Sequence, residues 1–355
     1  MKHRFFYPIL LLLASCTNNH YTLEDFRSVK KIDTHMHLNA EDPSLIDLAK
    51  EDNFFLLTVN VDAGVSIDEQ ERIARIVTHA YPQQVQYLST ISMNGFPGTS
   101  WMDSTMARLR SSMDHGALGI KVWKNIGIEV RDSTGKFVMI DDPAFDPVWK
   151  FLTDNNQTLM GHLGEPKNCW LPLEQMTVNN DRDYFKDHPQ YHMYLHPEYP
   201  TLEVIMAARD HVLEKNPNLR FVGAHLGSLE YDLKELAKKL DKFPNMAVDM
   251  AARIPHLQYL TQQDRQQVLE FFDRYQDRII YATDNGIEKD SDPAEEKESV
   301  HKIWLADWRY FTTGDSLASP HVNGKFRGLN LEKKIIDKIY RENAIKWFGI
   351  TNVDK

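Results

Sequence analysis

The sequence predicts a single α/β domain in which eight parallel strands close into a (β/α)₈ TIM barrel, and three observations support this prediction. The chain has 355 residues, and a barrel takes about 250 residues or more. From residue 29 onward, β-rich runs alternate with amphipathic helical patterns eight times, which is typical of a closed parallel sheet. An open doubly wound sheet usually has a Gly-rich turn after its first strand, whereas this chain has His35-Met36-His37 there.

The expected elements follow one another through a barrel domain that spans residues 29–350. We expect strands at 31–34, 54–60, 86–91, 118–122, 158–161, 220–224, 246–249 and 278–282. We expect helices at 44–52, 67–80, 102–115, 146–155, 202–216, 229–242, 264–275 and 331–347. Pro217 and Pro244 come just before the sixth and seventh strands, where a proline ends the preceding helix.

Two connections, 165–201 and 285–330, are unusually long for loops without secondary structure. Both follow the carboxyl ends of strands, where the active sites of barrels form. Both are rich in aromatic residues: Trp170, Tyr184, Phe185, Tyr191, Tyr194 and Tyr199 in the first, and Trp304, Trp308, Tyr310 and Phe311 in the second. We expect them to wall or cover a substrate pocket, with packing against the barrel rim as the alternative.

The N-terminus has the pattern of an export signal. Lys2, His3 and Arg4 precede an apolar run, 5–14, that is shorter than the roughly 20 residues needed to span a bilayer. The run ends Leu-Ala-Ser-Cys16, which resembles the bacterial lipobox. The resemblance implies that residues 1–15 are a signal peptide, that Cys16 is lipidated and that residues 16–28 are a tether. The protein would then be exported and anchored to a bacterial membrane, at the periplasmic face or the outer membrane. The alternative is an ordinary signal peptide with a chance cysteine.

The net charge and the cysteine count limit which kinds of partner and cross-link the protein can have. Removing residues 1–15 takes away Lys2 and Arg4 and no acid, so the formal charge changes from −10 to −12. A chain with this negative charge lacks the basic surface that nucleic-acid-binding proteins need. We expect a small-molecule substrate instead. Cys169 is then the remaining cysteine, which leaves no partner for an intramolecular disulfide. The sequence leaves a homo-oligomer open.

Five metal-competent side chains follow apolar runs that should form strands. His35 and His37 are two apart, so both imidazoles face the same side of the first strand. His162, His225 and Asp284 end the fifth, sixth and eighth runs. The carboxyl ends of barrel strands converge on one cavity. One buried histidine is usually a hydrogen-bonded core residue, but four histidines and an acid at matching strand ends predict a metal site.

These residues also carry a family resemblance. The pattern Asp33-Thr-His35-Met-His37, Gly161-His162, Gly223-Ala-His225 and Thr283-Asp284 resembles the amidohydrolase superfamily. The amidohydrolase-related branch, which includes aminocarboxymuconate-semialdehyde decarboxylase, fits best, and residues 343–349 are similar to its closing helix. The resemblance covers roughly residues 29–350, nearly all of the mature chain, and says little about the substrate.

The resemblance implies a role for each residue. His35, His37, His162 and Asp284 would hold one divalent metal, and His225 would polarise the substrate or move protons. Asp284 would also accept a proton from metal-activated water. Zinc suits nitrogen and oxygen ligands, and manganese, iron and cobalt are alternatives. A metal that keeps an open position lowers the pKa of bound water to about 7.

Four further residues are substrate-binding candidates: Lys121, Arg253, Glu165 and Trp170. Some superfamily members carbamylate a lysine on the fourth strand to bridge two metals, and others use a cation there to bind a substrate anion. We expect the second use for Lys121, with a solvent-exposed lysine as the alternative. Arg253 follows the seventh strand and could bind a carboxylate, or be an ordinary surface arginine. Glu165 lies close after His162 and is expected to support the metal site.

The leading expectation is therefore a metal-dependent hydrolase that acts on a lactone or amide carbonyl of a small anionic substrate. The first alternative is a non-oxidative decarboxylase that uses the same site. The second is a binding lipoprotein that has lost turnover.

Overall fold

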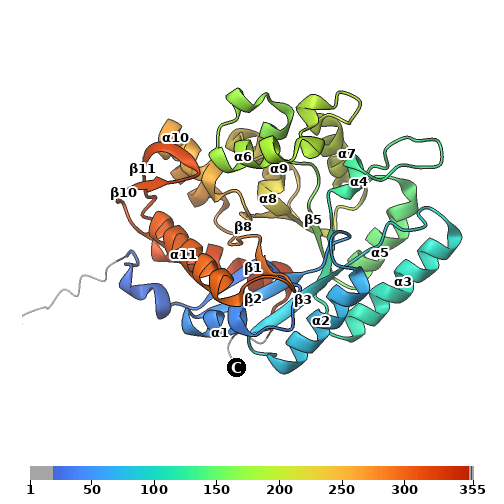
Figure 1. Ribbon diagram of the computed structural model, residues 1–355, viewed down its shortest axis with the longest axis horizontal. Coiled ribbons are helices and arrows are strands. Elements are labelled where there is room, and N and C mark those ends of the chain that lie inside the picture. Colours follow the sequence, from blue (N-terminus) through green and yellow to red (C-terminus); the bar gives the residue numbers. More distant parts are fainter. Residues whose placement is uncertain (1–18, 352, 354–355) are drawn as a thin grey trace, which may run out of the picture.

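The computed structural model describes residues 19–351 and residue 353, with a parallel sheet at its centre (Figure 1). The predicted signal segment 1–15 and the predicted lipidation site Cys16 lie outside the described residues. The strands of this sheet are β1 (Lys31–Leu38), β2 (Phe54–Val59), β3 (Val85–Thr90), β4 (Gly119–Val122), β5 (Thr158–Gly161), β6 (Arg220–Gly223), β7 (Met246–Asp249), β8 (Ile279–Ile280) and β9 (Asn285–Ile287). A strand is present at each of the eight predicted positions.

The sheet has nine parallel strands in the order β8-β7-β6-β5-β4-β3-β2-β1-β9. Its two edge strands, β8 and β9, are successive pieces of chain, so the sheet curls until its two edges meet. Backbone hydrogen bonds cross this seam from Thr34 N to Tyr281 O at 3.3 Å and from Asp284 N to His35 O at 2.9 Å.

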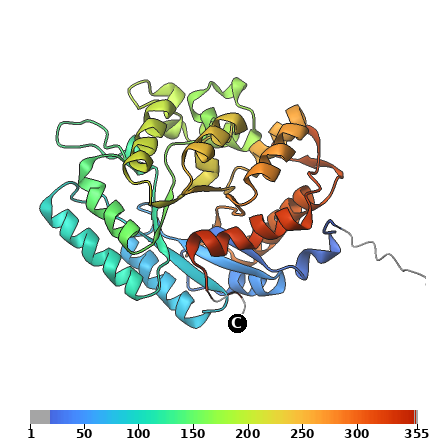
Figure 2. The same cartoon turned by 180° about the vertical axis from the view of Figure 1, so that it is seen from behind.

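Helices cover the outside of the curled sheet, as the two opposite views show (Figures 1 and 2). The helices of the described residues are α1 (Ser44–Glu51), α2 (Ile67–Ala80), α3 (Thr99–Asp114), α4 (Asn125–Ile128), α5 (Asp146–Asp154), α6 (Asn179–Asp187), α7 (Leu202–Lys215), α8 (Ala224–Gly227), α9 (Leu233–Lys242), α10 (Ile254–Tyr275), α11 (Pro293–Thr312), α12 (Lys333–Asp337) and α13 (Asn343–Phe348), with a π-helical turn, η7 (Lys338–Glu342), between the last two. None of the described helices combines the length and the apolar character that crossing a membrane requires.

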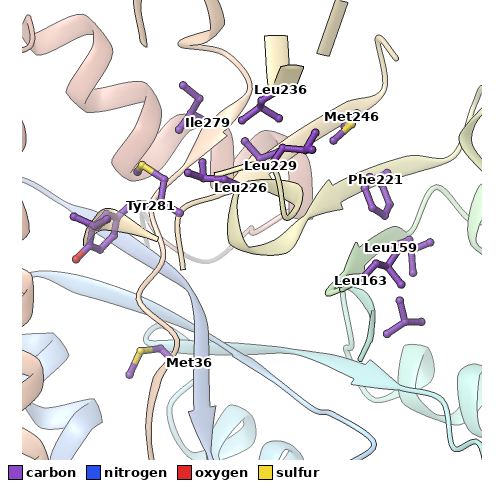
Figure 3. Close-up of a cluster of buried hydrophobic side chains, with 14 of the residues drawn as sticks. Met36, Leu159, Leu163, Phe221, Leu226, Leu229, Leu236, Met246, Ile279 and Tyr281 are labelled. Atoms are coloured by element: carbon purple, nitrogen blue, oxygen red, sulfur yellow. The ribbon is translucent and has the colours of Figure 1, made fainter. Parts of the chain in front are cut away.

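Side chains alternate between the inside and the outside of the curled sheet, because successive strand residues face opposite ways. Leu159, Phe221 and Ile279 pack outward against the helices (Figure 3). Their neighbours Met160, Val222 and Ile280 belong to a second cluster inside the sheet, which Trp347 and Phe348 of α13 also join. The Trp347 carbonyl accepts a hydrogen bond from Thr158 at the start of β5, so α13 closes the amino end of the sheet and leaves the carboxyl end open.

Several predicted helix boundaries were wrong. The helix expected from residue 229 begins at Leu233, where the Asp232 carboxylate accepts hydrogen bonds from the N–H groups of Lys234 and Glu235. The helix expected at 264–275 is the second half of α10, which starts ten residues earlier at Ile254 and is broken by non-helical angles at Asp264. The eighth strand keeps regular pairing only at residues 279–280.

The expectation that the two long connections lack secondary structure was also wrong. The first contains α6 and four short 3₁₀ turns, η3 (Lys167–Trp170), η4 (Leu173–Gln175), η5 (Pro189–Tyr191) and η6 (Met193–Leu195). The second contains β9, the 20-residue helix α11 and an antiparallel hairpin, β10 (Ser316–Ser319) with β11 (Val322–Arg327). Trp304 and Trp308 of α11 are fully buried, and Trp304 stacks on Phe54 of β2 with ring centroids 4.0 Å apart. Trp304 thus packs against the sheet, and Trp308 packs against the rings of Phe26 and Tyr340.

Candidate metal and catalytic site

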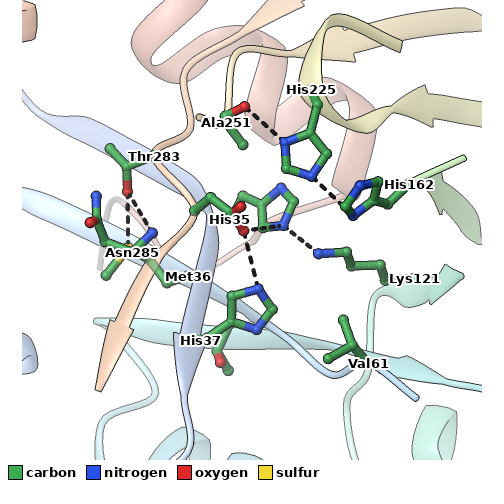
Figure 4. A network of polar contacts seen from close by, with 12 residues as sticks. His35, Met36, His37, Val61, Lys121, His162, His225, Ala251, Thr283 and Asn285 are labelled. Atoms are coloured by element: carbon green, nitrogen blue, oxygen red, sulfur yellow. Dashed lines mark hydrogen bonds and ion pairs between the residues drawn. The ribbon is translucent and has the colours of Figure 1, made fainter. Parts of the chain in front are cut away.

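All five predicted metal-site side chains lie in one polar network at the carboxyl end of the sheet (Figure 4). His35 and His37 belong to β1, His162 comes directly after β5, and His225 is the second residue after β6. Asp284 lies between β8 and β9. The predicted convergence of strand ends therefore brings these side chains together.

An irregularity in β1 directs the two histidines into this network. The pairing of β1 with β2 shifts register between Asp33 and Met36. Ile32 faces the inside of the sheet and Met36 the outside, although regular alternation would put them on the same side. A bulge of this kind re-aims the side chains that follow it.

The backbone is strained where it presents His225 and Asp284. Residues 225–228 all have φ between 55° and 60°, and three of the four are not glycine. Asp284 has φ 69°. Left-handed conformations cost L-residues about 1–2 kcal/mol each, and such strain concentrates at functional sites.

The Asp284 carboxylate joins the two histidines of β1. Its Oδ1 lies 3.0 Å from His35 Nε2 and 3.2 Å from His37 Nε2, and 29% of the side chain is exposed. Burial alone would raise the pKa of Asp284, but its contacts with His35 and His37 outweigh burial and hold that pKa well below its usual range. Asp284 is therefore ionised at neutral pH and open to a small ligand.

Asp249, at the end of β7, was missed by the sequence analysis. Its Oδ2 accepts a hydrogen bond from His35 Nδ1 at 3.0 Å, and its Oδ1 accepts from the backbone N–H groups of His225 and Ala251 at 2.7 and 3.1 Å. The acid fixes a proton on Nδ1 of His35 and directs Nε2 toward Asp284. The sequence could have identified Asp249, because it ends the seventh apolar run, just as His162 and His225 end the fifth and sixth runs.

His225 and His162 form a directed chain of hydrogen bonds. Nδ1 of His225 contacts the Ala251 carbonyl at 2.9 Å, so this nitrogen is the donor, and its Nε2 can accept from His162 Nδ1 at 3.1 Å. Nε2 of His162 is then unprotonated, buried and without a partner. Burial lowers the pKa of both histidines well below the usual value, which keeps their lone pairs available at neutral pH.

Lys121 lies inside the network, so the alternative of a solvent-exposed lysine was wrong. It is 1% exposed, and its Nζ contacts His35 Nε2. Burial lowers the pKa of Lys121 to about 8, against the opposing effect of Asp284 and Asp249. Slightly above physiological pH, a substantial fraction of the Lys121 side chains is therefore neutral.

Arg253 is 6% exposed, so it is not an ordinary surface arginine. Its Nη1 donates to the Ala252 carbonyl, while its Nε is buried without a partner. Nearby, His256 Nε2 contacts Asp181 Oδ2 at 3.0 Å in a buried pair that links α10 to α6. Arg253 thus has an unsatisfied donor, and its charge helps to lower the pKa of His225.

The two remaining candidates lie farther from the network. Glu165 is buried and forms an ion pair with Lys124, for which no role was predicted from the sequence. Lys124 is one of the charges that lower the pKa of His162, so this pair flanks the site. Trp170 is half-buried and its indole N–H donates to the Pro200 carbonyl at 3.4 Å. No described contact connects Trp170 to the histidines.

A second layer of contacts supports Asp284 from behind. Asp33 Oδ2 accepts hydrogen bonds from Thr283 Oγ1 at 2.6 Å and from Trp304 Nε1 at 2.9 Å. Gly286 pairs with His37, and a Cβ at Gly286 would lie 2.3 Å from the His37 carbonyl oxygen. Only glycine permits the approach of β9 to β1 that holds Asp284 beside the histidines.

The side chains present fit a divalent metal. Ligand atoms of His35, His225 and Asp284 all lie within 4.8 Å of one another, and the unpartnered Nε2 of His162 adds a free lone pair. Imidazoles and an ionised carboxylate are the donor set that zinc, manganese and iron accept.

Comparison with known proteins supports the same fold. A family model described as amidohydrolase matches residues 32–350. The solved structure of a 2,6-dihydroxybenzoate decarboxylase from Rhizobium is 15% identical over 90% of this chain and 99% of that chain, with a TM-score of 0.51. A dihydroxybenzoic acid decarboxylase from Polaromonas sp. JS666, solved with bound manganese and the inhibitor 2-nitroresorcinol, is 14% identical over 90% and 97%, with a TM-score of 0.53. A search of curated protein sequences finds no significant match. At these identities the solved structures show a common fold.

Proposed function

Because the chain belongs to the amidohydrolase family, we propose that it is a metal-dependent hydrolase that directs water to a lactone or amide carbonyl of a small anionic substrate. One observation carries the proposal: an ionised, partly exposed carboxylate, Asp284, lies within 3.2 Å of two imidazoles in an otherwise buried network. In this proposal β8 and β9 are halves of one eighth strand, the sheet is a (β/α)₈ barrel, and the metal lies at the carboxyl ends of its strands.

The proposed metal ligands are His35, His37, His162 and Asp284, with zinc as the expected ion and manganese, iron or cobalt as alternatives. The grouping of His35, His225 and Asp284 within 4.8 Å makes His225 a competing ligand. The metal would supply Lewis acidity and lower the pKa of a water molecule at the site. If Lys121 were carbamylated, two metals would bind.

The protein's own residues then have distinct tasks. Asp284 would accept a proton from the attacking water. His225, whose Nδ1–H is held by the Ala251 carbonyl, keeps an unprotonated Nε2 that would accept and return a proton near the substrate. Arg253 would bind the substrate anion through its unsatisfied Nε donor, and Lys121 would add positive charge beside it.

A non-oxidative decarboxylase is the second candidate function, and a specific comparison favours it. The two solved decarboxylases share the fold, and an arginine beside a metal would bind a substrate carboxylate as well in a lyase as in a hydrolase. The two reactions release different products, so measuring CO₂ against a newly formed acid separates them.

Metal analysis tests the proposal most directly. The purified protein should hold about one equivalent of metal, and the His35→Ala/His37→Ala variant should lose it. About two equivalents would indicate a carbamylated Lys121. No metal under any loading condition, together with no turnover, would overturn the enzyme hypothesis and leave the binding lipoprotein.

We also propose that the chain is exported and lipidated at Cys16, on the strength of the sequence of residues 1–16. Growth with an alkyne fatty acid should label the wild-type protein and leave a Cys16→Ser variant unlabelled. Equal labelling of both would contradict lipidation at this residue.

A further inference from the structure

Residues of α10, α11 and the hairpin β10–β11 line a large cleft. These elements lie together at one side of the molecule (Figure 1). The cleft encloses about 950 Å³, which is within the range of about 300–1,000 Å³ found for small-molecule sites. Most of its walls come from the connection 285–330, which the sequence predicted to wall a pocket, while α10 was not expected to contribute.

One end of the cleft lies against the backbone segments that carry Arg253 and Asp284. Ala252, Thr283 and Asn285 line it, and they are the chain neighbours of Arg253 and Asp284. The Asp284 side chain is 29% exposed, and Arg253 has a buried, unpartnered Nε. A molecule in the cleft would therefore extend toward the groups that would bind and transform its reacting end.

The walls of the cleft are mostly apolar. Ile254 of α10, Ile303 and Ala306 of α11, and Leu317 and Phe326 of the hairpin contribute to them. Such a surface favours an apolar occupant at roughly 25 cal/mol for each Å² removed from water.

The charged residues of the lining do not change this character. Lys302 pairs with Glu298 at 2.5 Å, and Arg309 pairs with Asp315 at 2.9 Å. Asp307 accepts a hydrogen bond from the Tyr281 hydroxyl at 2.9 Å, and burial raises its pKa to about 8. At neutral pH the two cations are paired and Asp307 is mostly protonated, so no strong unpaired charge repels an apolar group.

We propose that this cleft is the subsite for a bulky apolar group of the substrate, of the size of two linked aromatic rings, whose anionic reacting end lies at Arg253 and the histidines. The proposal rests on the proposed function for the identity of the reacting end. It adds the substrate class, which is an apolar carboxylic compound larger than a single ring.

Ala306 offers a direct test, because it is exposed on the cleft face of α11 and tryptophan there would fill the cleft without disturbing the core. Ala294→Trp is the matched control, since Ala294 is exposed on the same helix and does not line the cleft. Binding of benzoate, 2-naphthoate and biphenyl-4-carboxylate to the full-length protein would be measured by isothermal titration calorimetry, with circular dichroism to verify folding.

We expect the affinity to rise about tenfold or more from benzoate to biphenyl-4-carboxylate, because the second ring adds buried apolar area. Ala306→Trp should abolish this gain and leave benzoate binding unchanged, while Ala294→Trp should preserve both. An affinity that does not rise along the series, or a rise that survives in Ala306→Trp, would overturn the proposal. Because these are binding measurements, a protein without metal or turnover that still shows the gain would refute the proposed function and retain the subsite.

Discussion

Replacing Asp249 by asparagine should weaken metal binding without unfolding the protein. The amide oxygen of the new side chain can still accept from the N–H groups of His225 and Ala251, which lie 2.7 and 3.1 Å from the present carboxylate. Its NH₂ group would then face His35 Nδ1, which now contacts Asp249 Oδ2 at 3.0 Å. His35 would have to accept there, and its proton would move to Nε2, the nitrogen directed at Asp284.

The magnitude follows from that misplaced proton. A metal must displace it, and loss of the partner that orients a ligating histidine typically costs about 10–100-fold in metal affinity, or about 1.4–2.7 kcal/mol. Asp249→Ala should in addition leave two buried N–H groups unpaired, at about 1–3 kcal/mol of unfolding free energy each. The alanine variant should therefore be the less stable of the two.

Metal affinity would be measured by competition with a chromogenic chelator, and stability by urea unfolding. Asp181→Asn is the matched control, because Asp181 contacts His256 at the same 3.0 Å in an equally buried pair outside the network. Its metal affinity should equal that of the wild type. An Asp249→Asn protein with unchanged metal affinity would refute the argument that Asp249 sets the tautomer of His35.

Three further predictions concern the site and the seam behind it. The double variant His35→Ala/His37→Ala should lose its metal while retaining the circular dichroism of the wild type; retention of the metal in mass spectrometry would remove both histidines from the ligand set. Asp284→Asn should fold and lose turnover on any verified substrate, because the amide cannot accept the proton, and full activity would exclude Asp284 as the proton acceptor. Burial raises the pKa of Asp307 from 3.8 to about 8, so the folded state keeps a proton that the unfolded state releases, and this contribution to stability is lost as the pH rises from about 4 to 8. Asp307→Asn should therefore gain stability relative to the wild type between pH 5 and pH 8, as measured by urea midpoints, and a constant difference would contradict the raised pKa.

The sequence predicted the strands and the histidines because both depend on local patterns. Apolar runs of strand length ended at His162 and His225, and parallel strands bring such ends together. The same rule applied to Asp249 would have identified it. Helix α11 also had local signals that were not used, namely the Asp292-Pro293 start and the four-residue spacing of Trp304 and Trp308.

Other features depend on tertiary structure and could not be predicted. The turn at 225–228 is left-handed, a conformation that glycine usually marks in a sequence. Because only one of its four residues is glycine, the sequence does not predict the turn. The cleft is formed by α10, α11 and a hairpin that meet only in the folded protein. The burial of Arg253 and Lys121, which distinguishes site residues from surface cations, likewise emerges only when the strands assemble.

The seam of the sheet gives the site a mechanical role. The first and last parts of the sheet meet through β9 and through a few backbone hydrogen bonds, one of them from Asp284 N to His35 O. A ligand that contacts both His35 and Asp284 connects the two edges of the curled sheet. Any ligand that binds only the folded state stabilises it, by about 4 kcal/mol at a thousandfold excess over its Kd. The ion that serves the chemistry would therefore also resist the opening of the sheet, so catalytic competence and the integrity of the seam would be gained or lost together.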